Sequence, residues 1–143
     1  ILDLMKKGTV VADVKAVLAE SKQIGITNMV YIMFGFPTET KVEFLDTINF
    51  LKENSRSIDL VSTSTFGLQH GSKIEAAPER YNITNIQREQ RTILDEKISY
   101  NTNVGMQQEE VKKFRNNYRK TIKNLDKLPR TFAYFKEQVL GFV

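Results

Sequence analysis

The chain has 143 residues, of which 41% are hydrophobic and 27% charged, and its formal net charge is +4, a composition typical of a globular domain with one hydrophobic core. It contains no cysteine and one histidine, His70, which excludes disulfides, cysteine nucleophiles and thiolate-bound iron or zinc within the chain. No apolar run approaches the roughly 18 residues that cross a bilayer, so we expect a cytoplasmic protein without membrane contact.

The first predicted elements are helical. Residues 1–8 have the pattern of the last turns of an amphipathic helix closed by a glycine, and because the sequence starts at Ile1 we expect the beginning of that helix to precede it. Apolar residues at helical spacing predict a second helix over residues 10–24, with Thr9 as its N-cap and Gly25 as its stop.

A strand, helix and strand are predicted next. Residues 29–34 form a continuous apolar run, which is typical of a strand covered on both faces in a parallel sheet. Thr40 and Glu43 have the spacing of a capping box that starts a helix, and residues 60–66 are a second strand of the buried kind. Two or three parallel strands cannot close a barrel, which needs about eight. We therefore expect further strands of the same sheet to lie outside this sequence.

The second half of the chain is more polar. Residues 84–96 form a polar segment without a predicted element, and residues 98–104 predict a short edge strand. Two helices are predicted to follow, over residues 107–127 and 129–140. Residues 112–130 carry eight basic side chains and one acidic one.

Two loops follow the predicted strands, at residues 35–40 and 66–72. In parallel α/β folds, ligands bind at the loops that leave the carboxyl ends of the strands. Both loops contain glycine, which permits close approach of the backbone to a ligand, and the first is followed by a helix N-terminus with free amide donors. These loops are the candidate binding region.

The Gly-Phe-Pro-Thr-Glu-Thr motif of residues 35–40, at the end of an apolar strand, and the Gly-Ser-Lys-Ile motif of residues 71–74 resemble the later strands of the radical S-adenosylmethionine barrel. The resemblance covers residues 1–80. Residues 81–143 are similar to the extension in the branch of this family that carries a cobalamin-binding domain. The implied fold is α/β: a fragment of a partial TIM-type (β/α) barrel, made of the last βα units with parallel strands, followed by a mostly helical C-terminal extension.

The resemblance implies a function for an intact parent protein. A [4Fe–4S] cluster held by three cysteines would cleave S-adenosylmethionine reductively, and the 5′-deoxyadenosyl radical would take hydrogen from a small-molecule or peptide substrate. Cobalamin is a further cofactor that the branch implies for the parent. Since this chain has no cysteine, we expect it to hold no metal, to be inactive alone, and to need the N-terminal part of the same polypeptide as its partner.

The resemblance also implies which residues pack against the adenine of the cofactor. They belong to the first strand with its exit loop and to the exit of the second strand: Met33, Phe34, Gly35, Phe36, Pro37 and Leu68. Glu39 and Thr40 are expected to cap the following helix rather than bind a ligand. His70 is interpreted as an exposed loop histidine in preference to a substrate-contacting base. No catalytic residue is assigned.

Two alternatives belong to other classes. The first is a non-catalytic interaction module that docks an acidic or nucleic-acid partner through the basic helix at residues 112–130. Nucleic acid is disfavoured, because the aromatic residues of this helix lie on its apolar stripe and not among its charges. The second is a parallel-barrel enzyme that binds phosphate at the Gly35 loop, which is disfavoured because Pro37 has no amide to donate.

Overall fold

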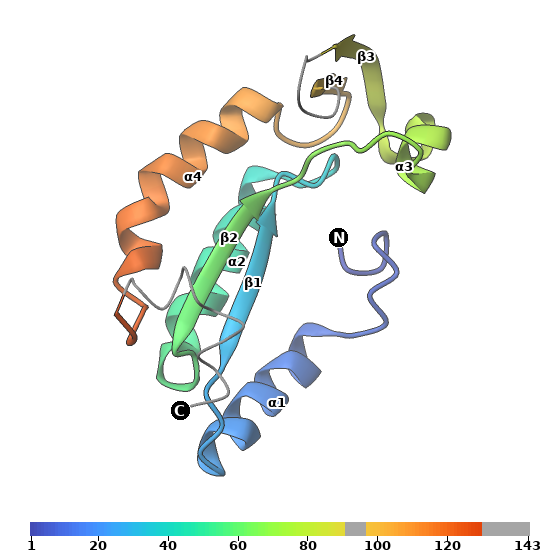
Figure 1. Ribbon diagram of the computed structural model, residues 1–143. Coiled ribbons are helices and arrows are strands. Elements are labelled where there is room, and N and C mark those ends of the chain that lie inside the picture. Colours follow the sequence, from blue (N-terminus) through green and yellow to red (C-terminus); the bar gives the residue numbers. More distant parts are fainter. Residues whose placement is uncertain (91–96, 130–143) are drawn as a thin grey trace.

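The computed structural model describes residues 1–90 and 97–129 and has a mixed α/β fold with two small sheets (Figure 1). The elements in chain order are α1 (Val11–Gln23), β1 (Met29–Phe34), α2 (Lys41–Glu53), η1 (Ser55–Ser57), β2 (Leu60–Thr65), α3 (Lys73–Ala76), η2 (Pro78–Tyr81), β3 (Ile83–Glu89), β4 (Lys97–Thr102) and α4 (Gln108–Lys123). The helix predicted over residues 129–140 lies almost entirely outside the described residues.

The β1 and β2 strands pair in parallel, with register running from Met29 opposite Leu60 to Phe34 opposite Thr65. This pairing confirms that the two predicted strands lie side by side, and it brings both carboxyl ends to the same edge. The connecting helix α2 starts with the predicted capping box, in which the Glu43 amide donates to the Thr40 hydroxyl and the Glu43 carboxylate accepts from the Thr40 amide.

One face of the β1–β2 pair carries the helices. Val30, Ile32, Phe34 and Val61 share this face by strand alternation and register, and they pack against side chains of α1, α2 and α4. Figure 1 shows α2 behind the two strands, with α1 on the β1 side and α4 on the β2 side.

No described helix covers the opposite face of the pair. By alternation this face carries Tyr31 and Met33 of β1 and Ser62 and Ser64 of β2; Tyr31 is 63% exposed. The expectation that both faces of the first strand are covered is therefore wrong for the described residues. The apolar run of residues 29–34 indicates that the strand is hydrophobic, but it does not indicate which elements cover each of its faces.

The β3 and β4 strands form a separate antiparallel pair, from Ile83 opposite Thr102 to Glu89 opposite Lys97, with an irregularity between Thr84 and Gln87. The pair confirms the short strand predicted near residue 98. The polar segment predicted at residues 84–96 was not expected to form a strand, because most side chains of β3 are polar. Ile83 and Ile86 are the β3 residues that contribute to the cluster of Leu68, Ile83, Ile98 and Tyr100.

Two predictions at the N-terminal end are corrected. Thr9 does not cap α1: the helix starts at Val11, and its N-cap residue is Val10, which makes no side-chain capping bond. Residues 1–8 form turns instead of a helix end, with Lys6 in the left-handed region at φ 53°. Gly25 follows the end of α1 with φ 85°, as its predicted role as a stop requires. Within the described ranges, no helix is long and apolar enough to cross a membrane.

Candidate functional site at the strand exits

The loop after β1 is folded around the side chain of Glu39. Gly35 has φ 78°, which turns its amide toward the Glu39 carboxylate, and the Gly35 nitrogen lies 2.5 Å from Glu39 Oε2. The Glu39 amide in turn donates to the Phe36 carbonyl at 2.7 Å. The loop is thus a tight turn whose only carboxylate, that of Glu39, points inward. The prediction that Glu39 caps the following helix is wrong, because its carboxylate accepts from the Gly35 amide of the loop itself.

Burial raises the pKa of Glu39 to about 7, and the hydrogen bond from Gly35 offsets part of this effect. Only 4% of the residue is exposed, so the carboxylate has lost most of its hydration. The carboxyl group therefore changes charge near neutral pH, which an ordinary glutamate does not.

A cavity of about 250 Å³ lies at the carboxyl ends of both parallel strands. Its strand-exit wall consists of Phe34, Gly35, Thr65 and Phe66, and residues of β4 and the first turn of α4 form the rest. Burial raises the pKa of Tyr100, one of these β4 residues, to about 12, so its hydroxyl stays protonated at neutral pH and does not act as a base.

The six residues predicted to contact a cofactor do not have equal access to this region. Phe34 lies against Phe44 in the core, Phe36 packs edge-on against Phe66 and Tyr81, and Leu68 belongs to the cluster beneath β3 and β4. Pro37 is also fully buried. Met33 and Gly35 are half-buried. The structure therefore leaves these two most open to a ligand, and cofactor contact stays a prediction for all six.

The second exit loop, after β2, is organised by Glu75. Its carboxylate accepts from the Gly71 amide at 2.6 Å and pairs with Arg88 at 2.6 Å, while His70 Nδ1 lies 3.4 Å away. The Gly71 amide, His70 and Arg88 together hold the pKa of Glu75 below its usual range. The His70 side chain is 74% exposed, which agrees with its interpretation as a loop histidine.

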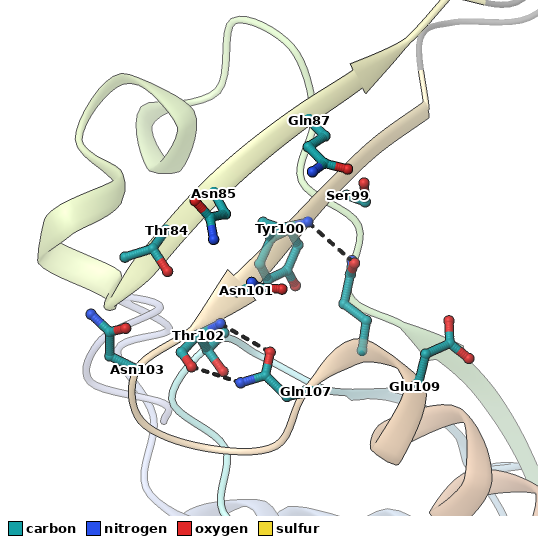
Figure 2. Close-up of a pocket in the computed structure, with 11 residues that line it drawn as sticks. Thr84, Asn85, Gln87, Ser99, Tyr100, Asn101, Thr102, Asn103, Gln107 and Glu109 are labelled. Atoms are coloured by element: carbon teal, nitrogen blue, oxygen red, sulfur yellow. Dashed lines mark hydrogen bonds between the residues drawn. The ribbon is translucent and has the colours of Figure 1, made fainter.

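A larger polar groove of about 680 Å³ runs along β3, β4 and the start of α4 (Figure 2). Carboxamide and hydroxyl side chains dominate it: Thr84, Asn85, Gln87, Ser99, Asn101, Asn103, Gln107 and Gln108. Gln107 forms a two-point contact with the backbone of Thr102, accepting from its nitrogen at 3.2 Å and donating to its oxygen at 2.7 Å. Gln108 accepts from the Tyr100 nitrogen at 3.3 Å. These glutamines occupy hydrogen-bonding positions along β4.

The basic residues of α4 serve different purposes. Arg115 donates to the Thr63 carbonyl at 2.9 Å and Lys112 pairs with Glu109, whereas Lys113, Arg119 and Lys120 are exposed. Phe114 and Tyr118 pack against Phe44 of α2. The aromatic residues of α4 therefore belong to the core, and nothing in their placement provides a stacking surface for bases.

No group of three or more His, Cys, Asp or Glu side chains within the described ranges is arranged to hold a metal ion. An iron–sulfur cluster does not fit this chain, because its usual ligands are cysteine thiolates and the sequence has none. Comparison of the chain with family models, curated proteins and solved structures finds no match.

Proposed function

We propose that this chain forms the C-terminal end of the catalytic domain of a radical S-adenosylmethionine oxidoreductase. In this proposal β1 and β2 are the last strands of a partial (β/α) barrel, and residues from 81 onward belong to an extension whose helix α4 packs against them. The observation that carries the proposal, beside the motifs at residues 35–40 and 71–74, is an asymmetry of the parallel pair. One of its two outer edges is closed by side chains, and no described strand pairs with the other.

The closed edge belongs to β2. The Leu60 amide donates toward β1, at the Asn28 carbonyl, so by alternation Val61 and Thr63 direct their backbone groups away from β1. The Val61 amide donates to the Asp126 carboxylate at 2.9 Å, and Arg115 donates to the Thr63 carbonyl at 2.9 Å. A further strand beside β2 would have to displace both side chains, which supports β2 as the last strand of the proposed sheet.

The other outer edge belongs to β1. No described strand pairs with its outer side, and the adjoining helix α1, together with its N-cap Val10 and its C-cap Ile24, presents an exposed apolar stripe at seven-residue spacing. Val10, Val17 and Ile24 in this stripe are 54%, 62% and 77% exposed. A soluble helix buries such a stripe against another element. A preceding βα unit would satisfy both features, with its strand beside β1 and its helix on this stripe.

The face without described helices fits the inner wall of such a barrel. Its centre combines Tyr31 and Met33 with Ser62 and Ser64. A filled barrel interior is dominated by bulky branched side chains, whereas this mixture of hydroxyl and apolar groups suits a wall that faces a ligand. In the parent, the cluster and S-adenosylmethionine would supply a carbon radical, and this wall would position substrate and exclude water.

The decisive experiment uses the full-length protein that contains this chain. After anaerobic reconstitution with iron and sulfide, we expect a brown protein with a charge-transfer absorption band and reductive release of 5′-deoxyadenosine from S-adenosylmethionine. Reconstitution of the 143-residue chain alone is the matched control and should stay colourless, since it lacks cysteine. A full-length protein without cluster absorption or nucleoside release would refute the proposal.

A further inference from the structure

The loop after β1 is held from outside by a segment that lies more than sixty residues later in the chain. The Met106 amide donates to the Glu39 carbonyl at 2.8 Å. Gly105, with φ 88°, lies directly on the same loop, because a Cβ atom built there would be 2.8 Å from the Thr38 carbonyl carbon and 2.9 Å from the carbonyl oxygens of Pro37 and Glu39. Contact as close as this between two backbones excludes any side chain.

A second close contact lies at the start of the same loop. A Cβ atom on Gly35 would be 2.8 Å from Cγ1 of Val111, in the first turns of α4. Val111 and Met106 are both buried in the cluster that contains Phe34. The loop therefore touches the returning chain at Gly35 and again over residues 37–39.

The returning segment is itself held in shape. Gln107 binds both backbone groups of Thr102 through its carboxamide, and its own amide donates to the Glu110 carboxylate at 3.0 Å. The two bonds to Thr102 close the turn over residues 103–106, which has Gly105 near its tip, and the bond to Glu110 fixes the first turn of α4. The turn and the start of α4 therefore form a preformed unit.

We infer that residues 102–111 act as a clamp that sets the conformation of the strand-exit loop at residues 35–39, so that Gly105 and Gln107 are positioning residues for the nucleoside ligand of that loop. The ligand part of this inference rests on the proposed function. The contacts inside the loop are few, namely the Gly35 amide to the Glu39 carboxylate and the Glu39 amide to the Phe36 carbonyl. The external contacts are needed because displacement of binding groups by about 1 Å weakens positioning strongly.

The test compares Gly105→Ala with Gly25→Ala in the reconstituted full-length protein. Both glycines have nearly the same positive φ, 88° and 85°, but a Cβ atom on Gly25 meets nothing within 4 Å. The two variants therefore share the backbone strain of alanine and differ in the close contact. We expect Gly105→Ala to raise the Kd for S-adenosylmethionine about tenfold, with iron content unchanged, and Gly25→Ala to bind like the wild type.

Amide hydrogen exchange of the same proteins provides a readout that needs no cofactor. Exchange in residues 33–40 should be about tenfold faster in Gly105→Ala than in Gly25→Ala, because loss of the clamp allows local opening of the loop. Gln107→Ala, which removes only side-chain hydrogen bonds, should shift both measurements in the same direction if Gly105→Ala fails to fold.

The outcomes separate the clamp from the proposed function. Faster exchange in a protein that binds no S-adenosylmethionine would support the clamp and refute the ligand part of the inference together with the proposed function. The clamp would be overturned if amide exchange and affinity changed equally in Gly105→Ala and Gly25→Ala. It would also be overturned if neither quantity changed in Gly105→Ala and Gln107→Ala.

Discussion

Replacing Glu39 with glutamine tests the electrostatics of the strand-exit loop. Burial raises the pKa of this carboxyl from 4.5 to about 7 in the folded protein. Between these values the folded chain holds the proton more tightly than the unfolded chain does. The destabilisation of the folded state by Glu39 is therefore smallest at low pH, where the carboxyl group is protonated. The free energy of unfolding falls as the pH rises from 4.5 through about 7.

The size of the effect follows from the two pKa values. At about 1.4 kcal/mol per pH unit, the difference between 4.5 and about 7 corresponds to a loss of about 3 kcal/mol once Glu39 is fully ionised. By the linkage relation, about 0.8 kcal/mol of this is already lost at pH 5, so the change between pH 5 and pH 8 is about 2.5 kcal/mol. Glutamine carries no titrating group and keeps an oxygen that accepts from the Gly35 amide.

Urea unfolding of the chain at pH 5, 6, 7 and 8 measures this difference. We expect the wild-type free energy of unfolding to fall by about 2.5 kcal/mol more than that of Glu39→Gln over the range, with the two proteins diverging most steeply below pH 7. Glu53→Gln, at an exposed position near the end of α2, is the matched control and should follow the wild type. Parallel pH profiles for wild type and Glu39→Gln would show that Glu39 is ionised at no cost, which refutes the reasoning.

Two further substitutions test contacts elsewhere in the fold. Thr40→Ala removes the oxygen that accepts from the Glu43 amide, so the free energy of unfolding in urea should fall by about 1 kcal/mol, whereas Thr40→Ser should retain most of it; an unchanged midpoint in Thr40→Ala would contradict this role of the capping box. Burial alone would raise the pKa of Asp59, but bonds from Lys22 and the Asn28 amide outweigh it and hold the pKa below its usual value. The stabilising contribution of Asp59 is therefore present above pH 3.8 and is lost as the pH falls through the folded pKa. The midpoint of urea unfolding should drop less between pH 6 and pH 3 in Asp59→Asn than in the wild type. Equal drops in the two proteins would argue against the ion pair.

Local sequence signals were sufficient for the βαβ unit. The apolar run of residues 29–34, the spacing of Thr40 and Glu43, and the stripe of α4 each depend on neighbours within one or two turns of chain. Such signals are complete in the sequence, so β1, the capping box, β2 and the core-facing side of α4 could be predicted. The same signals were weaker at the N-terminal end of α1, where the N-cap residue Val10 makes no side-chain capping bond.

The tertiary structure determined the contacts between segments that lie far apart in the chain. Arg115 and Thr63 are separated by 52 residues and Asp126 and Val61 by 65, and no local pattern encodes that these pairs close the edge of β2. The close contact at Gly105 is likewise invisible in sequence, because a glycine near a helix start is ordinarily interpreted as a turn. Side-chain periodicity reports which side of an element is apolar, but only the packing of the whole chain determines what lies against that side.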